Sequence, residues 1–185
     1  MAVKDKIILG IDPGTNVMGY GLINCKGPAI HLIQFGVIHL DKYKNHEIKL
    51  KKIYSRVTEL IVEYLPDEVA LEAPFYGKNV QSMLKLGRAQ GVAMAAALNK
   101  DIPINEYAPK RVKQSVTGNG NASKEQVASM IKTLLKFNEA PKLLDATDAL
   151  AVALCHHFST KLGGTSGASG KSWKSFIAEN PGRVK

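Results

Sequence analysis

The sequence predicts an α/β fold in which a mixed five-stranded sheet is flanked by helices. Two apolar stretches near the N-terminus are separated by Gly27 and Pro28, and such a turn is typical of an antiparallel hairpin. Farther along, strand-like and helix-like patterns alternate, which is typical of strands covered by helices. The 185 residues, 45% of them hydrophobic, suffice for one domain with a sizeable core.

The first three expected strands are residues 7–11, 18–24 and 30–39. The first is a continuous apolar run, as in a strand that is buried on both faces. It ends in an acid, Asp12, which Pro13 and Gly14 follow directly. A carboxylate at that position either begins a turn or binds a ligand held by the turn.

Helix and strand patterns then alternate. Apolar residues recur at helical spacing over 46–64, and Pro66 ends that helix. A short strand over 69–71 also ends in an acid, Glu72. A helix rich in small residues follows over 80–98, and then a fifth strand over 104–107. The small residues favour either a close-packed subunit interface or a core helix against the sheet.

The C-terminal third begins with a loop that contains Gly118, Gly120 and Asn121. Ser123 then begins a helix, and Gln126 completes a capping box. A last helix, dominated by Ala and Leu, is expected over 142–157. The following stretch is rich in Gly, Ser and basic residues. We therefore expect one domain over 1–158 and a basic, flexible tail over 159–185.

The overall charge is unusual. A net charge of +9 and a pI near 9.5 favour an acidic partner, of which nucleic acid is the commonest, although a solvated lysine-rich surface is the alternative. Cys25 and Cys155 both lie in apolar stretches and suit a reducing cytosol. Because Asp12 interrupts the early apolar run, we expect no signal peptide, and no apolar run is long enough to span a bilayer. A cytoplasmic protein is expected.

Four carboxylates form a candidate metal site. Asp145 and Asp148 are three residues apart, so a helix places them on one face, where they repel each other. A magnesium ion removes that penalty. Singly, Asp145 could be a helix N-cap, Asp12 a turn initiator and Glu72 an exposed strand end. Taken together they favour a site, because parallel strands bring their C-terminal ends to one edge of a sheet.

Several motifs in this order resemble the RuvC family of Holliday junction resolvases, which have a ribonuclease H-like fold. They are GIDPGTNVMGYG (10–21), LEAPFYGKNVQSMLKLGRAQGVA (71–93), YAPKRVKQSVTGNGNASKEQV (107–127) and DATDALAVALCHH (145–157). The resemblance covers residue 7 to about residue 158. Two positions depart from it: Met18 stands where the family often has Thr, and Ala73 stands where the family has a polar residue.

The resemblance implies that Asp12, Glu72, Asp145 and Asp148 are the catalytic acids and bind Mg²⁺, with two ions per site and with Mn²⁺ able to substitute. It also implies an endonuclease that resolves four-way DNA junctions by paired, symmetric nicks during recombination and repair. The implied partners are a second copy of the chain, in a homodimer, and the RuvAB branch-migration complex. His156 and His157 are interpreted as structural.

The resemblance also points to DNA contacts. Phe75 would stack on a base exposed at the crossover, whereas a core phenylalanine is the alternative. Basic residues that would neutralise phosphates follow Glu72 on the next loop and helix and flank the Gly/Asn loop: Lys78, Lys85, Arg88, Lys110, Arg111, Lys113 and Lys124. Among them, Lys113 and Lys124 match positions near the scissile phosphate.

Two other functions compete. The DPGT stretch (12–15) resembles the first phosphate loop of actin-like and sugar-kinase-like ATPases, but these need a second domain for which the chain has little room. A non-catalytic junction-binding module is the other alternative. It predicts a damaged set of acids, and all four are present.

Overall fold

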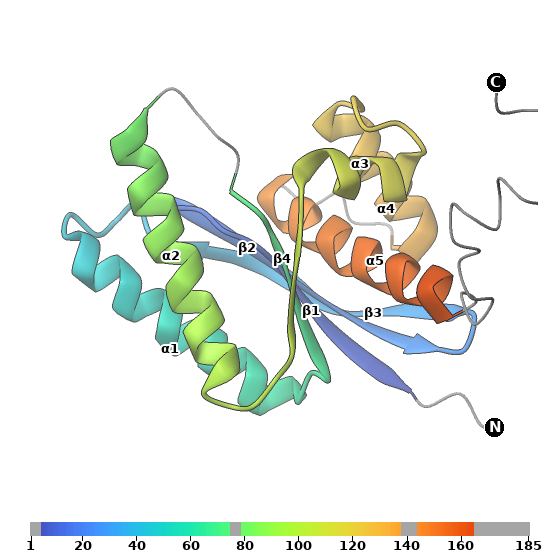
Figure 1. The fold of residues 1–185 in the computed structure, drawn as a ribbon, viewed down its shortest axis with the longest axis horizontal. Helices are drawn as coiled ribbons and strands as arrows, with labels where there is room; N and C mark the ends of the chain where they lie inside the picture. Colours follow the sequence, from blue (N-terminus) through green and yellow to red (C-terminus); the bar gives the residue numbers. More distant parts are fainter. Residues whose placement is uncertain (1–4, 75–78, 138–143, 165–185) are drawn as a thin grey trace, which may run out of the picture.

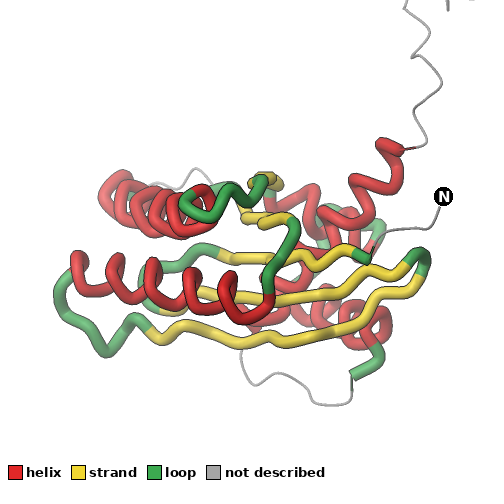
Figure 2. Tube along the Cα trace, turned by 90° about the horizontal axis from the view of Figure 1, so that it is seen from below, coloured by secondary structure: helices red, strands yellow, loops and turns green. Residues whose placement is uncertain are grey.

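The computed structural model describes residues 5–74, 79–137 and 144–164, with side chains up to residue 160. A five-stranded sheet in the order β3-β2-β1-β4-β5 separates two groups of helices (Figure 1). Helices α1 and α2 cover one face of the sheet, and α3, α4 and α5 cover the other. Figure 2, turned by 90°, shows the long strands side by side. This is the mixed, helix-flanked sheet that the sequence predicts.

The strands begin and end close to the expected positions. β1 (Lys6–Asp12), β2 (Val17–Lys26) and β3 (Ala29–His39) form an antiparallel meander, with Gly27 at a positive φ of 57° in the turn. β4 (Glu68–Glu72) pairs in parallel with β1, and β5 (Ile104–Tyr107) pairs in parallel with β4. β1, β3, β4 and β5 therefore all end at the same edge of the sheet.

Helices α1 (His46–Tyr64) and α2 (Val80–Leu98) have the predicted bounds. They pack against the sheet residues Leu9, Ile11 and Leu71 in one core. Within α2, the buried side consists mainly of alanines, Ala89, Ala93, Ala96 and Ala97. The small residues on this side of α2 therefore form core contacts, as in the core-helix alternative.

The second group of helices differs in part from the sequence prediction. A helix that the sequence analysis missed, α3 (Pro109–Thr117), begins with a proline in its first turn and ends at Gly118, whose φ is 76°. Only Val112 and Val116 are buried, so its apolar pattern is one helical repeat long. Next comes α4 (Lys124–Leu135), which has the predicted capping box between Ser123 and Gln126.

Helix α5 (Leu144–Gly164) is longer than expected. The predicted end at residue 157 is wrong, because the helix continues through the first part of the expected tail. Ser159 accepts a hydrogen bond from Arg111, and Thr160 donates to the His156 carbonyl, so polar residues here support the helix. Residues 142 and 143 and the tail from 165 onward lie outside the described residues.

Glycines in β1 and β2 let α5 lie directly on the sheet. A methyl group on Gly10 would overlap the carbonyl oxygen of Ala149, and one on Gly19 would overlap that of Asp145. The helix is consequently buried over most of 146–157, and Asp148 remains partly exposed among these residues. Close approach at this point brings the first turn of α5 down to the sheet edge where β1 ends.

A polar chain is buried at the other end of α5. The His156 ring, 1% exposed, contacts the Tyr107 hydroxyl at 2.7 Å through Nδ1 and the Glu68 carboxylate through Nε2. Glu68 also pairs with Lys6 at 2.5 Å. The structural role expected for His156 is confirmed. None of the described helices has the length and hydropathy needed to cross a membrane.

Candidate active site

The candidate active site lies at the sheet edge where β1 and β4 end. Asp12 is the last residue of β1 and Glu72 the last of β4, on neighbouring parallel strands. Because side chains alternate along a strand, Asp12 shares a face with Ile8, and Glu72 shares one with Ala70. Ile8 and Ala70 both pack in the core beneath α5. Both acids thus face the helix that carries Asp145 and Asp148.

Three of the four predicted acids come within ligand distance of each other. Carboxylate oxygens of Asp12, Asp145 and Asp148 all lie within 4.8 Å of one another. Glu72 lies beside this group, close enough for its charge to act on Asp12. Asp145 lies inside the first turn of α5 and after its first residue, so the N-cap alternative is wrong. The arrangement can hold a divalent cation through oxygen ligands.

The electrostatics of the acids show an excess of negative charge. Burial, together with the charges of Glu72, Asp148 and Asp145, raises the pKa of Asp12 from 3.8 to about 8, although Lys124 lowers it. Burial, followed by the Asp148 charge, raises the pKa of Glu72 from 4.5 to about 7. A bound cation would therefore compete with protons at both groups near neutral pH.

Two predicted lysines, Lys113 and Lys124, place positive charge close to the acids. Lys124, the first residue of α4, donates to Asp148 Oδ2 at 2.6 Å. Burial lowers the pKa of Lys124, but the bond to Asp148 and the charges of Asp12 and Asp145 raise it overall. The charge of Lys113 in α3 acts on Glu72, and its ammonium group donates to the Ala122 carbonyl at 2.8 Å.

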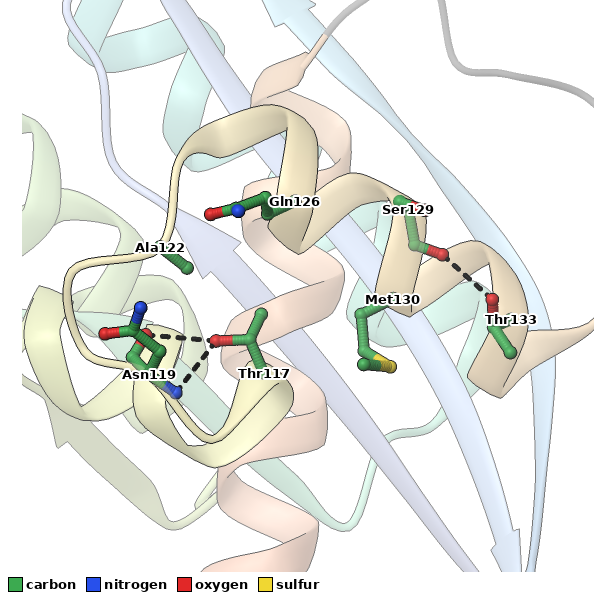
Figure 3. A pocket seen from close by; sticks show the side chains of 7 residues that line it. All are labelled: Thr117, Asn119, Ala122, Gln126, Ser129, Met130 and Thr133. Atoms are coloured by element: carbon green, nitrogen blue, oxygen red, sulfur yellow. Dashed lines mark hydrogen bonds between the residues drawn. The ribbon is translucent and has the colours of Figure 1, made fainter.

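The Gly/Asn loop joins the elements that carry these lysines. Within it, the backbone N–H of Asn119 donates to Thr117 Oγ1 at 3.1 Å, and the backbone N–H of Asn121 donates to Asn119 Oδ1 at 3.0 Å. Beside it lies a cavity of about 450 Å³ lined by Thr117, Asn119, Ala122, Gln126, Ser129, Met130 and Thr133 (Figure 3). None of these residues is charged, so the cavity is not part of the metal site. The hydrogen bonds within this loop hold its backbone between α3 and α4.

A smaller cavity, of about 130 Å³, lies directly at the acids and reveals a residue that the sequence analysis missed. Asp12, Glu72 and Gln90 of α2 are among the residues that line it. Gln90 is 4% exposed and donates to Glu106. A single glutamine on the alanine-rich side of a helix was the signal that could have identified it.

The loop after Asp12 is held by residues distant in sequence. Lys49 of α1 donates to the Thr15 carbonyl at 2.9 Å and to Asn16 Oδ1 at 3.1 Å. The amides of Leu40 and Asp41 both donate to the Asn16 carbonyl, at 2.8 and 2.9 Å. The sequence analysis did not identify Lys49, whose side chain is tied to the loop that follows the metal-site acid.

The other predicted DNA contacts differ in their surroundings. Lys85 and Arg88 are exposed on α2, and Lys110 is exposed on α3. Arg111 lies over the Tyr107 ring at 5.2 Å and bonds Ser159, so it has a structural role. Phe75 and Lys78 lie outside the described residues.

Known proteins resemble this chain along most of its length. The model of the family described as "Crossover junction endodeoxyribonuclease RuvC" matches residues 8–156. A protein of that name from Cytophaga hutchinsonii is 66% identical over 181 residues, covering 98% of this chain and 89% of the relative. Another, from Porphyromonas gingivalis, is 57% identical over 189 residues and is covered completely.

Solved structures give the same result. Thermus thermophilus RuvC in complex with a Holliday junction substrate has a TM-score of 0.80 and 33% identity, over 85% of this chain and 96% of that one. The yeast mitochondrial Holliday junction resolvase Ydc2 has a TM-score of 0.63 at 15% identity, over 85% and 80% of the two chains, and so shows the fold alone. With its ribonuclease H-like fold, this chain belongs to the RuvC family of crossover junction endodeoxyribonucleases.

Proposed function

We propose that this protein is a magnesium-dependent endonuclease that resolves four-way DNA junctions by paired, symmetric nicks during recombination and repair. The main support is that carboxylate oxygens of Asp12, Asp145 and Asp148 lie within 4.8 Å of one another, with Glu72 beside them. A non-catalytic binding module has no need to hold repelling, half-buried acids together. The names of the relatives support the same substrate.

The acids fit divalent metal ions. They offer only carboxylate oxygens, and the raised pKa values of Asp12 and Glu72 reflect a charge excess that cations offset. We propose Mg²⁺ as the ion, with two ions per site and with Mn²⁺ able to substitute. When bound, such ions supply an activated water and stabilise the leaving oxygen of an in-line phosphodiester hydrolysis.

The chain's own residues would bind and orient the DNA. Lys124, tied to Asp148 at 2.6 Å, stands where a phosphate approaching the acids would meet a positive charge. Lys113 would neutralise the same strand from α3, and the exposed Arg88 would contact phosphates on the α2 side. From the family resemblance we assign Phe75 to stacking on a base opened at the crossover and Lys78 to a phosphate contact.

A homodimer suits a substrate with two-fold symmetry, because each active site then cuts one of two equivalent strands. The outer side of α2 supports this proposal. Val80, Leu84 and Leu98 are 66%, 58% and 59% exposed. Gly87 and Gly91 lie between them at helical spacing, and a methyl group on either would meet open space. We propose that these five residues, the outer α2 stripe, contact the second copy.

The remaining assignments follow from the family. We propose that the dimer works beside the RuvAB branch-migration complex in the cytoplasm. Both cysteines, Cys25 and Cys155, are buried, which suits a reducing compartment. The catalytic domain is proposed to occupy 1–158, with a basic Gly/Ser-rich tail from 159, although α5 extends to Gly164.

The test is a synthetic four-way junction incubated with the protein, with and without Mg²⁺, and the cut positions mapped on all four strands. We expect symmetric nicks in one pair of opposing strands, only with the metal, and no cuts in a linear duplex of the same sequence. Tight junction binding without any metal-dependent cleavage would instead support the non-catalytic module.

A further inference from the structure

A groove of about 350 Å³ between the end of β3 and α1 carries positive charge that the proposed mechanism does not use. Its lining includes Lys42, Tyr43, Lys52 and Arg56. The ammonium groups of Lys42 and Lys52 both lie over the Tyr43 ring, at 5.4 and 5.9 Å from its centroid. One aromatic ring therefore gathers two like charges from different segments of the chain.

Among the described residues, no carboxylate pairs with either lysine. Glu59, the acid that lines the groove, is paired with the Arg56 guanidinium at 3.0 Å. Within residues 5–74, 79–137 and 144–164, neither Lys42 nor Lys52 makes an ion pair, and both are exposed. Two exposed cations without a counter-charge repel each other across the ring, and an external polyanion would relieve that repulsion.

The groove lies at the same edge of the sheet as the metal-site acids. β3 runs parallel to β1, since both pair antiparallel with β2, and His39 at its end is opposite Val17. One strand separates β1 from β3, which corresponds to about 10 Å. Leu40 and Asp41, which directly precede Lys42, are hydrogen-bonded to the loop that follows Asp12.

The groove thus lies at the same sheet edge as the acids, on the face that α1 covers. Resting on the proposed function, we infer that Lys42 and Lys52 bind the phosphate backbone of the junction arm that leaves the active site across the loop after Asp12. Flexible ammonium groups neutralise phosphates without reading bases, so the contact is independent of sequence.

The test compares two double variants with the same loss of charge. Lys42→Gln/Lys52→Gln removes the groove cations and leaves Lys49, which holds the Asp12 loop, in place. The control, Lys100→Gln/Lys132→Gln, removes exposed lysines after α2 and on α4. Junction affinity is measured without metal over a range of salt concentrations, and single-turnover cleavage is measured with Mg²⁺ at saturating protein.

For the groove variant we expect the slope of log affinity against log salt to become shallower by about 1.8 per bound protomer, because each protomer loses two phosphate contacts. The junction Kd should rise by roughly tenfold near 0.1 M salt, while the saturated cleavage rate stays unchanged. Equal slopes for the two double variants would overturn the inference. A wild-type protein that binds junctions but never cleaves them would remove the proposed function and leave this binding comparison intact.

Discussion

Glu68 and His156 join β4 to α5 at the end of the strand opposite the active site. Glu68 is the first residue of β4 and Glu72 the last, which corresponds to about 13 Å of strand. Asp148 and His156 are separated by about 12 Å of helix. Because these lengths match, the partly buried contact between the Glu68 carboxylate and His156 Nε2 sets how far α5 extends over the sheet edge. It thereby positions Asp148 beside Glu72.

The first prediction tests this relationship with Glu68→Gln, which keeps the shape but removes the charge that faces Lys6 and His156. We expect a loss of about 1–3 kcal/mol in stability, as for a buried polar group with impaired partners. We also expect the Mg²⁺ concentration for half-maximal cleavage to rise. The control is Asp41→Asn at an exposed ion pair with His39. An unchanged Mg²⁺ requirement would leave Glu68 with a purely structural role.

The second prediction concerns pH. The folded-state pKa of Asp12 is raised to about 8 and that of Glu72 to about 7, so the folded protein binds protons that the unfolded chain releases. In the metal-free protein, the contribution of these two groups to stability should therefore be greatest below about pH 4 to 5. It should fall as the pH rises towards 8. The Asp12 shift sets an upper bound of about 6 kcal/mol.

The variant Asp12→Asn should flatten this decline and be more stable than the wild type at pH 8 without metal, although it cannot cleave. Thermal melts of both proteins between pH 5 and 8, in chelator and in Mg²⁺, provide the measurement. Saturating Mg²⁺ should remove most of the decline in the wild type. A wild type whose metal-free melting temperature rises towards pH 8 contradicts the assigned charge excess.

The third prediction concerns Lys124, whose ammonium group lowers the pKa of both Asp12 and Glu72. Lys124→Met should slow junction cleavage by roughly 10²-fold, the typical effect of losing one stabilising donor in an active site. It should also move the rising limb of the pH–rate profile to higher pH, because the two carboxyl groups then hold their protons more tightly. The control is Lys132→Met on the same helix, and equal rates for both variants would argue against this role.

The fourth prediction concerns Gly19, which lies opposite Asp12 in the β1–β2 pair. In Gly19→Ala, the new methyl group overlaps the Asp145 carbonyl oxygen, so the first turn of α5 must move away from the sheet. We expect a destabilisation of about 1–3 kcal/mol, as for overpacking, and a loss of Mg²⁺-dependent cleavage. Mg²⁺ should also raise the melting temperature less than in the wild type, which thermal melts with and without the metal would measure.

The fifth prediction concerns the outer α2 stripe. Leu84→Glu should convert the proposed dimer to a monomer, since it places a charge in an apolar contact, with little change in the fold of the single chain. Sedimentation equilibrium gives the mass. Val62→Glu, at a position that is equally 58% exposed on α1, is the matched control. If Val62→Glu dissociates the dimer and Leu84→Glu does not, the interface lies on α1 and not on α2.

The sequence by itself determined the local features of this protein. Apolar spacing is set by the helical period, so the bounds of α1 and α2 could be read directly. The capping box at Ser123 depends on residues three positions apart. The acids at the ends of β1 and β4 and the Asp145–Asp148 spacing predicted the site, since strand direction and helix pitch are simple geometric constraints. A single helical repeat, as in α3, was too short a pattern to identify.

Only the tertiary structure decided which distant residues meet. Glu68 and His156 are separated by 88 positions, and Lys49 reaches the Thr15 carbonyl over 34 positions. Gln90 enters the site only because α2 packs over the sheet edge. The pKa of Asp12 rises to about 8 because packing buries it among three other acids. Burial and Coulomb interactions depend on distances in space, and no spacing along the chain encodes these before the two layers of helices close on the sheet.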